Sequence, residues 1–105
     1  MTRRNIRRAK AKQDILDIAD HIAADNLDAA LRFIDAAESA IEFLFGHPMV
    51  GIARPNIDPQ IPDLRIWPIR GFENFLVIYT VSDRETETLR VIHAARDLTA
   101  AIQDE

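Results

Sequence analysis

Cysteine is absent from this chain of 105 residues, and glycine is scarce, at three residues. Without cysteine the chain can form no disulfide framework, no thiolate zinc site and no cysteine nucleophile. So few glycines nearly exclude a glycine-rich phosphate loop, and neither an HExxH nor a GxSxG motif occurs. No apolar run approaches the roughly 20 residues that span a bilayer, and no hydrophobic segment follows the basic N-terminus as in a secretory signal. We therefore expect a cytoplasmic protein that does not associate with membranes.

Positive charge is also scarce outside the first twelve residues. Six of the thirteen basic residues lie there with no acid among them, whereas residues 13–105 carry seven basic against seventeen acidic residues, a balance of −10. An acidic body repels phosphate backbones, so we expect no direct sequence-specific DNA binding by this chain. The basic end is either an arm for a nucleic acid or an acidic partner, or a solvated edge, and we favour the edge.

The hydrophobic fraction of 48% indicates a single globular domain over residues 1–105. Residues 3–8 hold one apolar side chain and, if they pair at all, predict a charged edge strand. From Ala11 the apolar residues recur at i, i+3, i+4 and i+7, which predicts a helix. The apolar face is Ile15, Ile18, Ala19 and Ile22, and the positions between are filled by Asp14, Asp17 and Asp20.

A second helix follows a short interruption at Asp25-Asn26, and Asp28 is placed to cap it. Its apolar stripe is Ala30, Phe33, Ile34, Ala37, Ile41 and Leu44. Because the connection is short, the two helices should form an antiparallel hairpin, which needs a further surface to cover both stripes.

Residues 46–62 contain four of the five prolines and two of the three glycines, a composition typical of an irregular loop. The apolar residues that can anchor it are Met49, Val50, Ile52, Ile57 and Ile61. Loops of this length are often functional or bind partners.

The remaining residues predict strands. Leu64–Ile69 alternates and contains Pro68, which indicates an edge strand. Phe75–Val81 is a nearly continuous apolar and β-branched run, typical of a central strand covered on both faces. Thr88–Ala94 is the last predicted strand, and the short connections imply an antiparallel meander.

A final short helix is predicted where Asp97 can cap a segment containing Leu98 and Ile102. The predicted fold class is therefore α+β, in the order βααβββ with a short C-terminal helix. The two-helix hairpin should pack on one face of a small antiparallel sheet.

His93 is the strongest candidate for chemistry. Side chains alternate along a strand, so we expect His93 to share a face with Leu89 and Val91, with Arg90 on the other face and Tyr79 on the neighbouring strand. One hypothesis is a phosphodiester-cleaving site in which His93 is the general base, assisted by Tyr79 and by the charges of Arg90 and Arg96. The alternative, a core histidine beside paired arginines, is favoured, so we assign no catalytic residue.

Two further groups can be read in more than one way. Asp17, His21 and Asp25 recur at i, i+4 and i+8 and could hold a metal, but a solvated helix face is the better interpretation, and we expect no metal or cofactor. Trp67 lies close in sequence to Arg65 and Arg70. Tryptophan and arginine often anchor protein interfaces, whereas a partly buried core tryptophan is an equally good reading.

Several sets of residues form a recognisable series along the chain. They are Ala11–Ile15, Asp25-Asn26 with Ala29–Ile34, His47-Pro48 with Gly51, Leu64-Arg65, Pro68-Ile69, Gly71-Phe72, Asn74, Tyr79 and, most distinctive, Arg90–Asp97. In this order and spacing the chain resembles the ParE branch of the RelE/ParE toxin superfamily, over nearly its whole length.

The resemblance implies the toxin of a type II toxin–antitoxin pair, held in a hetero-oligomer by a ParD-like antitoxin. Members of the ParE branch poison DNA gyrase by protein binding, whereas members of the RelE branch are ribosome-dependent mRNA endonucleases. No lysine occurs after Lys12, and no histidine, tyrosine or arginine follows Asp97, which favours the ParE branch. A non-toxic member that retains only antitoxin binding is the third possibility.

Two sets of contact residues follow from these hypotheses. The antitoxin-binding candidates are Leu16, Leu27, Leu31, Arg65, Trp67 and Arg70. The candidates for target binding are Arg96, Asp97, Leu98 and Ile102. The first set contains apolar residues off the main helical stripes, of the kind that a folding amphipathic segment covers.

Overall fold

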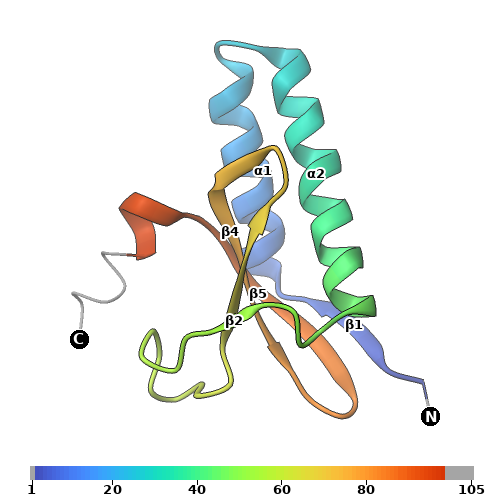
Figure 1. Cartoon of the computed structure of the whole chain (residues 1–105). Coiled ribbons are helices and arrows are strands. Elements are labelled where there is room, and N and C mark those ends of the chain that lie inside the picture. The colour runs from blue at the N-terminus through green and yellow to red at the C-terminus, as the bar shows by residue number, and fades with distance from the viewer. Residues whose placement is uncertain (1, 99–105) are drawn as a thin grey trace.

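The computed structural model describes residues 2–98, and it shows a two-helix hairpin on one face of a five-stranded sheet (Figure 1). The elements are β1 (Arg4–Arg7), α1 (Ala9–Ala23), α2 (Leu27–Gly46), β2 (Ile52–Ala53), β3 (Arg65–Ile69), β4 (Phe72–Val81), β5 (Glu85–His93) and a one-turn helix η1 (Ala94–Leu98). This confirms the α+β class and the order of the predicted elements. The two-residue strand β2, inside the proline-rich loop, was not predicted.

The strand order is β1-β5-β4-β3-β2. Strands β3 to β5 are antiparallel, as predicted, and β2 pairs with β3 in the same sense. β1 pairs with β5 in parallel, so the sheet is mixed rather than wholly antiparallel. A parallel pair needs a crossover connection, and the helical hairpin together with the rest of the sheet supplies one. Short-range turn signals cannot reveal this pairing, because β1 and β5 are about 80 residues apart in the sequence.

The charged edge strand predicted for residues 3–8 is confirmed as β1, and the arginines around it bind within the chain. Arg4 pairs with Glu85 and Arg8 with Glu87, each at 3.0 Å. Arg7 pairs with Glu38 of α2, and Arg3 donates to the carbonyl of Ser82 and the hydroxyl of Thr86. Each exposed pair contributes little alone, but together they orient β1 in the parallel register. The basic end is therefore an edge of the sheet with its arginines engaged, as favoured above.

The helices bury the stripes that were predicted for them. Phe33, Ala37, Ile41 and Leu44 of α2 are buried against the helix-facing residues of the sheet. The cap of α2 was wrongly assigned, since the side chain of Asn26 accepts the hydrogen bond from the Ala29 N–H at 3.0 Å. Asp28 lies in the first turn instead, where its charge suits the helix dipole and it pairs with Arg32.

A second apolar cluster covers the opposite face of the sheet, as predicted for a central β4. Its buried members are Leu64, Ile66, Leu76, Ile78, Leu89 and Ile92. The loop packs on it through Ile57 and Ile61 alone. The anchoring predicted for Met49, Val50 and Ile52 is wrong, because these side chains are 65%, 41% and 52% exposed.

Strand β3 has a covered end and an open end. β2 pairs only with Arg65 and Ile66, so the rest of β3 is an edge, as predicted from Pro68. A proline costs no ladder hydrogen bond where no neighbouring strand is present. The chain then reverses at Gly71, whose φ of 86° lies in the left-handed region that glycine adopts without strain.

Strand β5 contains an irregularity that changes which residues share a face. The pairing with β4 shifts by one residue, so that Ile78 pairs with Arg90 but Tyr79 with Thr88, and Leu89 is the extra residue. Leu89 therefore packs in the loop-side cluster, whereas Val91 packs in the helix-side cluster. The prediction that Leu89 shares a face with Val91 and His93 is wrong for this reason.

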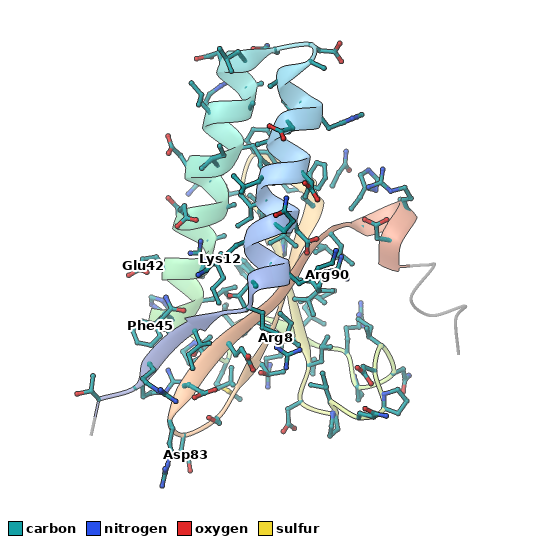
Figure 2. All side chains as sticks on the ribbon, turned by 180° about the vertical axis from the view of Figure 1, so that it is seen from behind. Arg8, Lys12, Glu42, Phe45, Asp83 and Arg90 are labelled. Atoms are coloured by element: carbon teal, nitrogen blue, oxygen red, sulfur yellow. The ribbon has the colours of Figure 1, made fainter. Side chains whose placement is uncertain are left out.

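The side chain of Asp14 joins α1 to β5. It is buried, and its carboxylate accepts hydrogen bonds from the backbone N–H of Val91 at 3.0 Å and from Arg90 at 2.7 and 3.1 Å. Figure 2 shows Arg90 beside α1. Sequence periodicity placed Asp14 with Asp17 and Asp20 between the apolar positions, and only those two are exposed.

We expect Asp14→Ala to lower the free energy of unfolding by about 2–3 kcal/mol, because the buried N–H of Val91 loses its only acceptor and Arg90 loses its partner. Asp14→Asn keeps an oxygen for that N–H and should lose roughly half as much. Urea unfolding followed by circular dichroism measures both variants.

The matched control is Asp20→Ala, an exposed aspartate on the same helix, which should change the stability by no more than about 0.5 kcal/mol. Equal losses for Asp14→Ala and Asp20→Ala would show that the buried carboxylate does not hold the helix to the sheet.

Candidate functional site

The residues predicted for a cleavage reaction do not share one open site. His93 is half-buried at the end of β5, where its ring packs edge-to-face on Phe75 with 5.3 Å between centroids. Its Nδ1 accepts the backbone N–H of Arg96 at 3.2 Å. The ring is thus packed in the fold and helps to close the first turn of η1.

The arginines near His93 are already paired with carboxylates. The hydrogen bond to Asp14 raises the pKa of Arg90 above its ordinary value, despite the opposing effect of desolvation. Arg96 binds Asp97 with Nε 2.9 Å from Oδ1, and this bond is the main cause that lowers the pKa of the Asp97 carboxyl. Arg90 is thus held by a buried carboxylate, whereas Arg96 is paired at the surface, where its side chain is 71% exposed.

A hollow of about 510 Å³ beside these residues has mixed charge. Its lining includes Arg8, Lys10 and Arg90, but also the carboxylates of Asp58 and Asp97. Arg8 and Arg90 have acidic partners of their own, Glu87 and Asp14. The hollow therefore lacks the excess of positive charge that an RNA-cleaving site needs for its substrate.

Tyr79 is fully buried, and both hydrogen-bonding capacities of its hydroxyl are used. It accepts the backbone N–H of Gly51 at 2.9 Å and donates to the carbonyl of Pro48 at 2.8 Å. Burial raises the pKa of Tyr79, since desolvation outweighs the opposing effects of the Gly51 hydrogen bond and of Arg65. A Cβ at position 51 would lie 2.2 Å from the hydroxyl oxygen, so this close approach requires glycine. Tyr79 thus holds the loop to the sheet.

Arg65 also holds this loop. Its Nη1 donates to the carbonyls of Met49 and Gly51 at 3.3 and 2.7 Å. Because Nη1 is used within the chain, Arg65 has fewer donors left for a partner protein. Trp67 and Arg70, predicted with it, lie elsewhere along the same strand and its turn.

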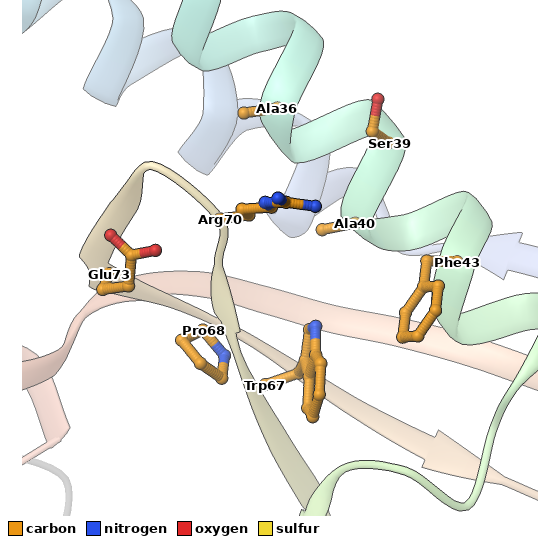
Figure 3. Close-up of a pocket in the computed structure, with 8 residues that line it drawn as sticks. All are labelled: Ala36, Ser39, Ala40, Phe43, Trp67, Pro68, Arg70 and Glu73. Atoms are coloured by element: carbon orange, nitrogen blue, oxygen red, sulfur yellow. The ribbon is translucent and has the colours of Figure 1, made fainter.

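Trp67 and Arg70 line a groove between α2 and the open end of β3 (Figure 3). Its volume is about 640 Å³, and its lining is Ala36, Ser39, Ala40, Phe43, Trp67, Pro68, Arg70 and Glu73. The small side chains of α2 leave room above the strand, and the aromatic residues form one wall. The result is an apolar channel with a charged end.

The aromatic wall is a stack of three rings. Phe43 is stacked on Trp67 with 5.8 Å between centroids, and His47 is stacked on Phe43 at 4.6 Å. Phe43 is nevertheless 42% exposed, which is unusual for an aromatic side chain on an amphipathic helix. Surfaces that expose large aromatic side chains in this way commonly bind other proteins.

The charged end of the groove is formed by the turn between β3 and β4. Arg70 is exposed and projects over the groove toward α2, and no carboxylate within residues 2–98 pairs with it. Glu73 lies at the same end, with its carboxylate accepting the Gly71 N–H at 2.8 Å. A partner can therefore supply a carboxylate to Arg70.

The predicted leucines lie outside the lining of the groove. Leu16 of α1 and Leu27 and Leu31 of α2 are 53%, 65% and 55% exposed. Leu27 and Leu31 are four residues apart and so share one face of α2. The surface predicted for an antitoxin is thus divided into two parts, the groove and these leucines.

Sequence reasoning missed the side of the groove that α2 contributes. Phe43 lies next to the buried Leu44 and is off the main stripe, and Ala36 and Ala40 were not distinguished from other helix-forming alanines. The one signal in the sequence is that Phe43 falls outside the apolar stripe of the helix, which predicts a large exposed apolar side chain. Sequence alone does not show that Trp67 lies opposite.

The C-terminal predictions are only partly within the described residues. Asp97 lies inside η1, where its carboxylate accepts the His93 N–H at 3.0 Å, so it is not the N-cap that was predicted. Leu98 ends this helix, and Ile102 lies outside the described residues.

No group of histidine and carboxylate side chains within residues 2–98 could hold a metal. Asp17 and His21 are exposed on α1, and Asp25 is exposed in the turn that follows it. In the same range, no helix is long and apolar enough to cross a membrane.

We expect Tyr79→Phe to lower the free energy of unfolding by about 1–3 kcal/mol, since the buried Gly51 N–H and Pro48 carbonyl lose their partner. Thermal unfolding measures this loss, and the activity per folded molecule should be unchanged. Loss of activity at unchanged stability would instead place the hydroxyl in a chemical step.

Comparisons with known proteins agree with this architecture. A family model described as the ParE toxin of the type II toxin–antitoxin system parDE matches residues 6–98. One similar solved structure is described as a chromosomal ParDE TA system from P. aeruginosa; it has 22% sequence identity and a TM-score of 0.63, over 83% of this chain and 90% of that chain. No curated protein matches this chain in sequence. Since the family model spans most of the sequence, the chain belongs to the ParE toxin family of type II toxin–antitoxin systems.

Proposed function

We propose that this toxin inhibits DNA gyrase in the cytoplasm by binding it, without catalysis, and is neutralised by a ParD-like antitoxin. The observation that carries the proposal is the unfilled apolar groove between α2 and β3, on a fold in which the residues considered for catalysis make structural contacts. These residues are His93, Tyr79, Arg90 and Arg96. The groove offers the antitoxin a surface to cover, and the engaged side chains argue against an endonuclease, which needs free acid, base and cationic groups.

The groove fits one amphipathic helix of the antitoxin. Ala36 and Ala40 let a helix backbone approach closely, and Trp67 and Phe43 offer flat apolar area to its side chains. Arg70 at the end of the groove would pair with a carboxylate of that helix. These features support a helix with an aliphatic face and an acidic residue as the occupant.

The exposed leucines form a second apolar surface on the hairpin, outside the groove. A segment that folds on binding can wrap a large area, and the ordering entropy is offset by the apolar surface it covers. Leu16, Leu27 and Leu31 would give such a segment contacts beyond the groove. We therefore assign the antitoxin to the groove and the leucines, with Arg65 contributing less, since it binds the loop.

For the target we propose the C-terminal end of the chain. Arg96 is exposed beside Asp97 on η1, and these residues lead into Leu98 and on to Ile102. This end belongs to a different element from α2, so the surface for the target need not coincide with the groove. An antitoxin can then neutralise the toxin by covering both the groove and the target-binding end, or by blocking access of the target to that end.

We expect Ser39→Trp, which fills the groove from its exposed rim, to weaken antitoxin binding by roughly 10- to 100-fold, or about 1.4–2.8 kcal/mol. Isothermal titration calorimetry with the cognate antitoxin measures the change. The control Gln60→Trp adds the same side chain at an exposed position of the loop whose Ile57 and Ile61 pack on the face of the sheet opposite to the helices, and it should bind within about threefold of the unmodified toxin. Equal weakening by both substitutions would contradict the assignment of the groove.

The target is tested in two reactions with purified toxin. In a gyrase supercoiling reaction we expect loss of supercoiling and accumulation of linear DNA, because the toxin stabilises the cleaved complex. In a coupled translation reaction we expect intact mRNA. Cleavage of mRNA with supercoiling unaffected would identify a ribosome-dependent endonuclease, and inactivity in both reactions with retained antitoxin binding would identify a non-toxic member.

A further inference from the structure

Half of strand β5 has no neighbouring strand on one side. β1 pairs with β5 only from Glu85 to Thr88, and the Arg8 N–H makes the last contact, to the Thr88 carbonyl at 3.0 Å. The chain then enters α1. Within the described residues, no strand therefore pairs with Leu89–His93 on the side away from β4, and α1 reaches this edge only through Asp14, against which the Val91 N–H is buried.

Two backbone donors point out of this edge. Val91 pairs with Val77 of β4, and His93 pairs with Phe75, two residues further along each strand. The N–H groups of Val91 and His93 are bound by side-chain carboxylates rather than by β4. In a strand, donors two residues apart are those that one neighbouring strand would accept.

Each of the two donors is bound by a carboxylate that an arginine holds in place. Asp14, from α1, accepts the Val91 N–H at 3.0 Å and is bound at both oxygens by Arg90. Asp97, from η1, accepts the His93 N–H at 3.0 Å and is bound at both oxygens by Arg96. The same arrangement, a backbone N–H, a carboxylate and an arginine, thus occurs at two successive positions of the edge.

We propose that Asp14 and Asp97 form an edge guard, which keeps Leu89–His93 from pairing with the same segment of a second copy of this chain. An open edge is a template for strand addition, and this segment is apolar and β-branched enough to pair with itself. A two-fold axis would place its outward donors opposite the outward carbonyls of the other copy. The carboxylates occupy those donors, and their charge repels the approaching carbonyls.

The other edges of the sheet are protected by different means, so the two carboxylates are needed only at the unpaired half of β5. β1 presents arginines and an asparagine, β2 is only two residues long, and the open end of β3 contains Pro68. Charged residues, very short strands and proline all discourage edge-to-edge pairing. The unpaired half of β5 has none of these, since it reads Leu-Arg-Val-Ile-His, and its arginine is turned to Asp14.

The test removes both carboxylates in the double variant Asp14→Ala/Asp97→Ala. The matched control Asp17→Ala/Asp20→Ala removes the same charge from exposed positions of α1. Sedimentation velocity over a concentration series measures the oligomeric state, and amide hydrogen exchange by NMR measures the protection of Val91 and His93.

We expect the double variant to dimerise with increasing concentration. At low concentration the Val91 and His93 amides should exchange about tenfold faster or more than in the unmodified chain, and they should regain protection on association. The control should match the unmodified chain in both measurements. The single variant Asp97→Ala, in the exterior helix η1, should expose only the His93 amide and should dimerise more weakly than the double variant. If the double variant does not fold, this single variant tests the proposal.

Two results would overturn the inference. One is a variant that stays monomeric at every concentration although these amides exchange freely. The other is a dimer that forms while Val91 and His93 remain unprotected, because the contact would then lie elsewhere.

Discussion

The position of the helical hairpin on the sheet depends on one buried carboxylate, that of Asp14. It satisfies the Val91 N–H, which no strand of residues 2–98 reaches, and it fixes Arg90 at the irregular point of β5. A buried backbone donor without an acceptor is costly, so this contact restricts where α1 can lie along β5. The apolar stripes favour burial on the sheet but are compatible with several positions, and the carboxylate selects one of them.

A second polar contact explains why apolar surface remains exposed. The loop after α2 is held by the Tyr79 hydroxyl, at Gly51 and Pro48, and by the guanidinium of Arg65. Since these bonds fix the backbone, the nearby side chains of Met49 and Val50 need not be buried, and both stay in solvent. Next to this loop, Phe43 and Trp67 are likewise left partly uncovered. A protein that binds others by contact keeps its folding contacts and its binding surface on different residues in this way.

Much of the fold was predictable because it depends on local patterns. The helical stripes, the continuous apolar run of β4 and the proline of β3 each act within a few residues, and each predicted element is present. The irregularity at Leu89 was not predictable, since it arises from how β5 fits two neighbours at once. It also explains why the alternation of side chains along a strand wrongly predicted that Leu89 and His93 share a face of the sheet. The groove could not be predicted from local patterns, because it forms where α2 and β3, about thirty residues apart in the sequence, lie side by side.

The sequence by itself determined the class of fold, the order of its elements and, through the series ending in Arg90–Asp97, the resemblance to the ParE toxins, which the family match bears out. Only the tertiary structure decided the roles of the charged residues. Asp14 and Asp17 are alike in the sequence, yet one is buried against β5 and the other is in solvent. The arginines around β1 could equally have formed a binding arm, but their partners are carboxylates far along the chain. The physical reason is that the role of a charged side chain depends on the group that it contacts in space, and these contacts join residues that are far apart in the sequence.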